Sequence, residues 1–149
     1  MLVLDSTVLL AALDRARGSH QAARSILSSD VPKAVTTQTM REALAVATRP
    51  LVANGLGLEF DRAWASIRAL RMACDRLLHE TEAWWTSYTT LATDIRPSGR
   101  TIYDLGQVAH VHCLGASARL VTDDTGLVSR YGGYIGVVTV ASYRPSPTT

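Results

Sequence analysis

The sequence predicts an α/β fold: a three-layer α/β/α sandwich around a central, mostly parallel sheet. Short apolar segments typical of buried strands alternate with segments whose apolar residues recur at helical spacing. Strands that alternate with helices form parallel βαβ units with right-handed crossovers. The chain has 149 residues, of which 47% are hydrophobic, so it can bury a core without disulfides or a structural metal.

The predicted elements follow from apolar runs, helical periodicity and breaker residues. In the first half we expect strand 2–4, helix 8–13, helix 20–27, strand 31–36 and helix 39–48. In the second half we expect helix 58–74, helix 80–91, helix 103–114, strand 118–122 and strand 135–140. Phe60, Trp64, Ile67, Leu70 and Cys74 keep helical spacing, which predicts that they form the apolar stripe of helix 58–74.

Composition limits the class of protein and its location. We expect one domain over residues 1–143 and a flexible tail over 144–149. The longest apolar run, Val8 to Leu13, is far shorter than the roughly 18 residues of a membrane span. No basic region precedes it, so no signal peptide is expected and a cytoplasmic protein is predicted. Cys74 and Cys113 lack paired spacing, which predicts free thiols.

The basic residues are almost all arginine. The net charge of +2 is too small to indicate nucleic-acid binding by itself. Arginine suits phosphate and carboxylate groups, although a GC-rich genome produces the same bias. Lys33 is the sole lysine and comes early, which disfavours a phosphoryl-accepting receiver. A phosphatase is disfavoured because it needs Asp-x-Asp where this chain has Asp5-Ser6-Thr7.

Acidic residues stand where strands end. Asp5 follows the first strand and Asp123-Asp124 follow strand 118–122. Asp104 precedes the helix that leads into that strand, and Glu42 lies early in the helix after strand 31–36. Right-handed crossovers bring both to the edge formed by the carboxyl ends of the strands. The four side chains Asp5, Glu42, Asp104 and Asp124 are therefore expected to converge.

Helix capping is the simpler interpretation of each acid taken alone. Asp5 and Asp124 stand at N-cap positions, and Thr39-x-x-Glu42 and Thr101-x-x-Asp104 match the capping-box pattern. Capping does not explain convergence, because two carboxylates about 4 Å apart repel by roughly 4 kcal/mol at an effective dielectric of 20. Oxygen ligands favour Mg²⁺ or Mn²⁺ as the neutralising cation. Such a site can activate a water and stabilise a reacting phosphate.

Four segments resemble the PIN domain, specifically VapC-type ribonuclease toxins. They are Asp5-Ser6-Thr7, residues 39–50 with Glu42, residues 103–109 with Asp104, and residues 115–124. The resemblance implies a PIN-like fold and an endoribonuclease that cleaves RNA by metal-activated water. It implies that Asp5, Glu42, Asp104 and Asp124 bind Mg²⁺ or Mn²⁺ and are catalytic, with Thr7 and Thr122 in support. A cognate antitoxin and a homodimer are the implied protein partners.

Two departures from the family pattern keep an alternative open. Leu127 stands where related toxins often carry an acid or Phe, and His110, His112 and Cys113 replace an alanine-rich helix. Offsets of two and three do not place those three side chains on one helical face, so no metal site is expected there. The alternative is a non-catalytic PIN-like module that binds protein. Trp64, Trp84 and Trp85 are expected in the core or at a dimer contact.

Strand alternation separates Asp123 from Asp124. If Leu120 and Thr122 face one side of the sheet, Asp124 continues that side and Asp123 faces the other. We therefore expect Asp124 to be the fourth ligand. Asp123 is expected to be exposed or to cap a turn over residues 125–131.

Overall fold

Five strands form the central sheet of the protein, whose structure is a computed structural model that describes residues 1–143. The strands are β1 (Leu2–Leu4), β2 (Lys33–Thr36), β3 (Arg76–Leu78), β4 (Arg119–Thr122) and β5 (Gly136–Thr139). Their order in the sheet is β3-β2-β1-β4-β5, and every neighbouring pair is parallel. The predicted sandwich is confirmed, with a fully parallel sheet in the described residues. The flexible tail predicted for residues 144–149 lies outside the residues that the structure describes.

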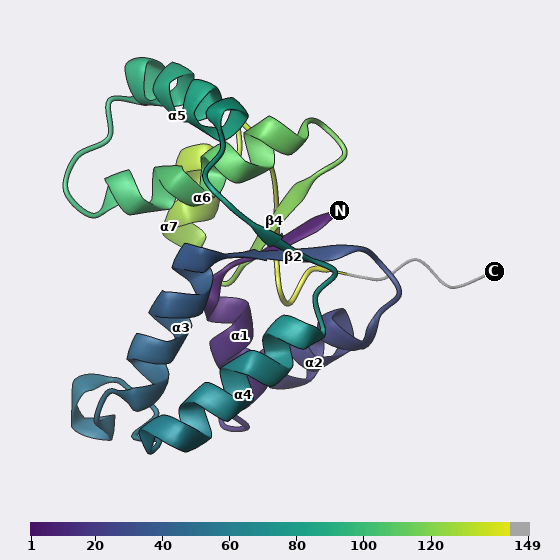
Figure 1. The fold of residues 1–149 in the computed structure, drawn as a ribbon, viewed down its shortest axis with the longest axis vertical. Coiled ribbons are helices and arrows are strands. Elements are labelled where there is room, and N and C mark those ends of the chain that lie inside the picture. The colour runs from purple at the N-terminus through teal and green to yellow at the C-terminus, as the bar shows by residue number, and fades with distance from the viewer. Residues whose placement is uncertain (144–149) are drawn as a thin grey trace.

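Helices cover both faces of this sheet (Figure 1). One layer contains α1 (Ser6–Leu13), α2 (His20–Ser28), α3 (Thr37–Thr48) and α4 (Phe60–Met72). The other contains α5 (Glu82–Ile95), α6 (Thr101–Leu114) and α7 (Thr125–Tyr131). A short 3₁₀ turn, η1 (Leu51–Ala53), follows α3. In residues 1–143 no helix is both long enough and apolar enough to cross a bilayer.

Strand alternation divides the core into two clusters. Leu2 and Leu4 of β1 pack with the layer that contains α1 to α4. Val3, between them, packs with the layer that contains α5 to α7. In β4, Val121 and Leu120 divide in the same way. Both faces of β1 and β4 are therefore buried, which explains why their sequences are almost continuously apolar.

Strand β3 was not predicted. Its three residues pair with β2 at the edge of the sheet, and only Leu78 is fully buried. A pair of leucines between two helices has no alternation from which a strand can be recognised. The predicted helix 80–91 begins at Glu82 instead, where the Thr81 side chain accepts a hydrogen bond from the Trp84 backbone.

The apolar stripe of α4 differs from the expectation. Ala63, Ile67 and Leu70 are buried, whereas Phe60 is exposed and Trp64 is 43% exposed. Helical spacing fits both sets, because Ala63 and Ile67 are also four residues apart, and spacing alone does not choose between them. Trp84 is buried in the core as expected, while Trp85 is 52% exposed. Cys74 is a buried free thiol and Cys113 an exposed one.

The strand order creates a crevice beside β1. From β1 the chain moves through β2 to β3 at one edge, and β4 and β5 lie on the other side of β1. Helices that follow β1 and β4 consequently leave toward opposite faces, α1 to one layer and α7 to the other. In parallel α/β sheets this reversal point, at the carboxyl ends of the strands, is where ligands bind.

Candidate active site

A cleft of about 580 Å³ opens at the carboxyl ends of β1 and β4. All four carboxylates predicted from the sequence line it: Asp5, Glu42, Asp104 and Asp124. Three guanidinium groups line it as well: Arg49, Arg100 and Arg130. The cleft therefore combines acids from four separate segments with basic groups that can face a phosphate.

Asp5 is the most buried of the four acids, with 5% of its surface exposed. Its Oδ2 accepts hydrogen bonds from the Thr7 and Thr122 hydroxyls, both at 2.8 Å. Those hydroxyls accept in turn from the backbone N–H groups of Asp123 and Asp124, both at 3.0 Å. The two threonines thus join the end of β1 to the end of β4. Asp5 makes no side-chain cap bond to α1, so capping does not describe its role.

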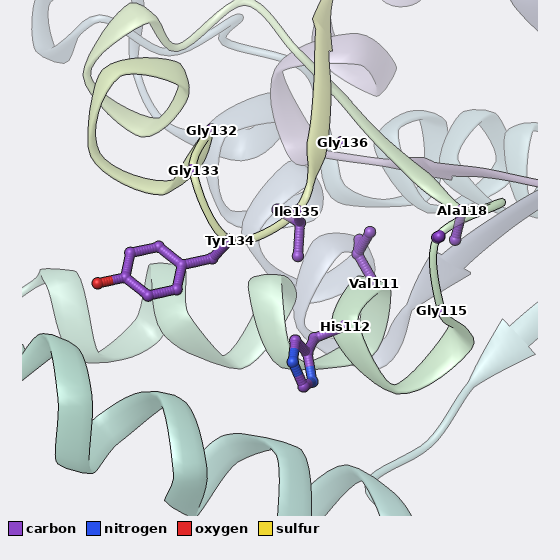
Figure 2. Close-up of a pocket in the computed structure, with 10 residues that line it drawn as sticks. Val111, His112, Gly115, Ala118, Gly132, Gly133, Tyr134, Ile135 and Gly136 are labelled. Atoms are coloured by element: carbon purple, nitrogen blue, oxygen red, sulfur yellow. The ribbon is translucent and has the colours of Figure 1, made fainter.

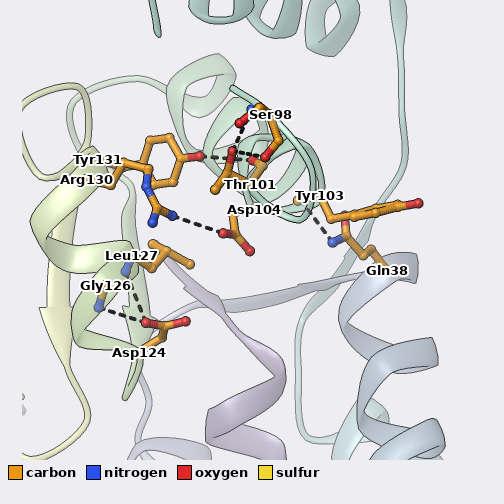
Figure 3. A network of polar contacts seen from close by, with 10 residues as sticks. All are labelled: Gln38, Ser98, Thr101, Tyr103, Asp104, Asp124, Gly126, Leu127, Arg130 and Tyr131. Carbon is orange, nitrogen blue, oxygen red and sulfur yellow. Dashed lines mark hydrogen bonds and ion pairs between the residues drawn. The ribbon is translucent and has the colours of Figure 1, made fainter. Parts of the chain in front are cut away.

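Asp124 and Asp123 face different surroundings. Asp124 lines the cleft, and its Oδ1 accepts from the backbone N–H groups of Gly126 and Leu127 at 2.8 and 3.1 Å (Figure 3). Asp123 Oδ2 instead accepts from the Ser19 hydroxyl at 2.5 Å, just before α2. The predicted alternation holds. Asp124 caps α7, as the capping interpretation of that residue expected, so the alternative in which Asp123 is the cap is wrong; the expected turn over 125–131 is the helix α7.

Glu42 is oriented by its own helix. Its Oε1 accepts from Gln38 Nε2 at 2.7 Å, one turn earlier in α3, and the same nitrogen donates to the Tyr103 carbonyl at 3.0 Å. The capping box predicted from Thr39 is absent, because Thr36 caps α3 by accepting from the Thr39 backbone at 3.0 Å. Glu42 is consequently left free of capping.

Asp104 lies in the first turn of α6 and pairs with Arg130 of α7. The distance from Arg130 Nη1 to Asp104 Oδ2 is 3.3 Å (Figure 3). The expected capping box at Thr101 is also absent, because Thr101 bonds Ser98 and lies inside the helix. Burial raises the pKa of Asp104, the negative charge of Asp124 raises it further, and Arg130 partly opposes both. The carboxylates thus interact electrostatically across the cleft.

Gln107 is a site residue that sequence reasoning missed. It is 3% exposed, and its Nε2 donates to Asp5 Oδ1 at 3.0 Å while its Oε1 accepts from the Thr39 hydroxyl at 3.3 Å. Asp5 therefore accepts hydrogen bonds from four side chains in three elements: Ser6 (at 3.4 Å) and Thr7 of α1, Thr122 of β4 and Gln107 of α6. Gln107 follows Asp104 by three residues, a spacing that places both on one face of a helix. This spacing from Asp104 is the sequence signal that could have indicated Gln107 as a site residue.

The donor set fits a hard divalent cation bound partly through water. In residues 1–143 no three His, Cys, Asp or Glu side chains are grouped closely enough to enclose an ion. Mg²⁺ typically keeps several waters and uses one or two carboxylates together with substrate phosphates. Carboxylates that share a cleft but do not form a closed cage suit that mode of binding better than the closed sites of structural zinc.

A separate hollow of about 400 Å³ lies at the opposite end of the sheet (Figure 2). It is bordered by Ala118 and Gly136 at the starts of β4 and β5, by His112 and by the Gly132–Gly133 turn. No acidic residue lines it. The carboxylate cleft is therefore the better candidate for the active site.

No family model and no curated protein sequence matches this chain significantly. Solved structures do match it. VapBC2 from Rickettsia felis, bound to a promoter DNA fragment, gives a TM-score of 0.69 at 12% identity, covering 93% of this chain and 97% of that one. VapC20 from Mycobacterium tuberculosis, a toxin that cleaves the sarcin–ricin loop, gives 0.65 at 14%, covering 97% and 100%. A toxin–antitoxin complex from Klebsiella pneumoniae gives 0.61 at 17%, covering 97% and 100%. The chain therefore shares the fold of these structures, a PIN-like α/β/α sandwich.

Leu127 is the position at which the sequence departs from the toxin pattern that it otherwise resembles. It is 3% exposed, packs in the core from the inner face of α7 and forms part of the cleft wall. Its backbone N–H donates to Asp124, so the residue contributes to orienting that carboxylate without adding one of its own.

Proposed function

We propose that the protein is a metal-dependent endoribonuclease and the toxin of a toxin–antitoxin pair. The observation that carries the proposal is the gathering of four carboxylates from four segments in one cleft of a VapC-type PIN fold. The fold is shared with a toxin that cleaves the sarcin–ricin loop, and with a toxin–antitoxin complex. Both likenesses support the proposal.

Mg²⁺ or Mn²⁺ held by Asp5, Glu42, Asp104 and Asp124 would supply a more acidic water and positive charge for the reacting phosphate. The chain's own residues prepare the cleft for this. Thr7, Thr122 and Gln107 keep the Asp5 carboxylate in one orientation, and the backbone of α7 orients Asp124. Preorganised acceptors need no rearrangement when a cation arrives.

The arginines complete the substrate site. The four carboxylates repel the phosphates of an RNA backbone. Binding of RNA therefore requires basic side chains that line the cleft, in addition to a cation bound among the acids. Arg49 and Arg100 line the cleft from different elements, and their planar donors suit phosphate oxygens. Arg130, which pairs with Asp104, is positioned to turn toward a phosphate when a cation neutralises that carboxylate. An RNA strand bound here would meet arginines as well as the acids.

Asp124→Asn is expected to lower RNA cleavage or metal affinity tenfold or more, about 1.4 kcal/mol, while Asp123→Asn changes neither by as much as about threefold. Asparagine keeps the cap of α7, because its side-chain oxygen accepts the same backbone bonds. The substitution therefore removes charge without removing the helix end. Initial rates at saturating Mn²⁺ and metal titration by calorimetry measure the two effects.

The result for Asp123→Asn decides whether the assignment of Asp124 as the fourth ligand stands. A larger loss from Asp123→Asn than from Asp124→Asn would place the active register one residue earlier in the chain. Asp124→Ala serves as a further control, since it removes the cap as well and should lower the melting temperature where asparagine does not.

The antitoxin is expected to insert an arginine among Asp5, Glu42 and Asp104, since a guanidinium can occupy an acidic pocket in place of a cation. Expression of the chain alone should slow bacterial growth, and co-expression with the adjacent small reading frame should restore it. Colony counts under an inducible promoter measure both results. Full growth of cells that contain the folded, metal-binding protein would favour the non-catalytic, protein-binding module instead.

A homodimer belongs to the same proposal. Trp85 on α5 and Tyr103 on α6 are exposed, and large exposed aromatic side chains can pair with a second copy.

A further inference from the structure

A second hollow, of about 310 Å³, lies beside the carboxylate cleft at the carboxyl end of β3. Residues from three elements line it: Thr37, Gln38 and Arg41 of α3, Leu78 and His79 at the end of β3, and His110 of α6. Gln38 stands between the two sites, because its amide donates to Glu42 and to the Tyr103 carbonyl, and both of those residues line the cleft. One side chain therefore separates the two sites.

His110 is the unusual group in this hollow. The residue is 8% exposed, and its ring nitrogens make no hydrogen bond within residues 1–143. Because no fully buried side-chain nitrogen in that range lacks a partner, these nitrogens open into the hollow. Burial, and secondarily the charge of His79, lowers the pKa of His110 to about 4. At neutral pH the ring is uncharged and presents one unused donor and one unused acceptor. Nitrogens that open into a hollow without a protein partner are free to bind a ligand there.

A flat ligand in this hollow would meet the rings of His79 and His110, which line it. Trp84 lines an adjoining hollow; its ring packs against the imidazole at 5.6 Å, centroid to centroid, and its indole N–H is fixed by a 3.0 Å bond to the Gly106 carbonyl. Arg41 and His79 are exposed at the rim, beside Glu80. The volume is at the lower end of the roughly 300–1,000 Å³ of small-molecule sites, enough for one ring system.

We propose that this hollow binds one nucleobase of the RNA strand whose backbone crosses the carboxylate cleft. The inference rests on the proposed ribonuclease function and adds a base-reading subsite to it. A neutral imidazole with a free donor and acceptor matches the edge of an uncharged base. Arg41 at the rim can bind the adjoining phosphate. Single-stranded RNA is recognised in this way, with bases splayed out beside aromatic rings and hydrogen-bonded at their edges.

The direct test is titration of the full-length, ¹⁵N-labelled protein with AMP, GMP, CMP and UMP, following the histidine side-chain nitrogens by NMR. At least one nucleotide should shift the His110 resonances at millimolar concentration. Those of His112, an exposed histidine on the same helix, should stay in place. No shift of His110 with any of the four overturns the proposal. A His110 shift that depends on protein concentration and not on nucleotide also overturns it, because a second copy of the chain then covers the hollow.

A binding experiment tests the same subsite on RNA. In the presence of a chelator, His110→Phe should weaken binding of a fluorescent single-stranded RNA about tenfold, the effect of losing one or two hydrogen bonds to a neutral group. His112→Phe is the matched control and should change binding little. An RNA that carries an abasic site in place of the base proposed to enter the hollow should bind the native protein and His110→Phe equally. Circular dichroism checks that the variant folds, and the nucleotide titration of the native protein does not depend on it.

Cleavage assays separate this proposal from the proposed function. Metal-dependent cleavage whose rate is the same with and without each base near the cut overturns the subsite and leaves the ribonuclease. A nucleotide-induced His110 shift in a protein that cleaves no RNA overturns the ribonuclease and leaves the base-binding hollow.

Discussion

Asp5→Asn is expected to reduce metal-dependent RNA cleavage by about 100-fold or more, the size of effect seen when one preorganised electrostatic group is removed from a reacting centre. Asp5 is the most buried acid in the cleft and the one that side chains hold most firmly. Asparagine has nearly the same shape, so the change removes a negative charge and little volume. Single-turnover cleavage at saturating Mn²⁺ measures the loss.

The same substitution should leave a folded protein. If the new amide nitrogen replaces Oδ2, the hydroxyls of Thr7 and Thr122 can rotate to accept from it, and Oδ1 continues to accept from Gln107. Melting followed by circular dichroism checks this. Asp14→Asn is the matched control, because Asp14 is a carboxylate outside the cleft that pairs with Arg17 at 3.4 Å near the surface. Equal losses from both variants, or an unfolded Asp5→Asn, would argue that Asp5 is structural.

Divalent metal is expected to stabilise the folded chain strongly. At about 100 times its dissociation constant, Mg²⁺ or Mn²⁺ should add about 2.7 kcal/mol to the free energy of unfolding. For a chain of this size that corresponds to a rise in melting temperature of about 8 °C. Calorimetric melts with and without metal measure the shift. A melting temperature that millimolar Mg²⁺ and Mn²⁺ leave unchanged would contradict the shared site.

The metal effect should also depend on pH, in a direction set by Asp104. Burial and the neighbouring Asp124, Asp5 and Glu42 raise its pKa, while Arg130 lowers it. The folded protein therefore holds this proton more tightly than the unfolded chain, so metal-free stability rises as the pH falls through the raised pKa. The proton competes with metal, and the metal-induced shift in melting temperature should shrink over that range. Asp104→Asn should raise metal-free stability and weaken this pH dependence.

The sequence alone was enough to predict the positions of the acids along the fold. Asp5 and Asp124 directly follow apolar strands, and the handedness of βαβ crossovers carries Glu42 and Asp104 to the same edge of the sheet. Strand alternation also separated Asp124 from Asp123 correctly, because a period of two fixes which side of the sheet a residue faces. These inferences needed only local pattern and a topological rule, and both are properties of the chain itself.

Tertiary structure decided the contacts that orient those acids. Gln107 reaches Asp5 across 102 positions of sequence, and Arg130 reaches Asp104 from another helix. Strand β3 exists because β2 offers it a partner, and His110 contacts Trp84 because α6 packs beside α5. Local propensity has no information about such pairs. Whether two polar side chains meet depends on how separate elements pack, and that packing is determined by the whole core at once.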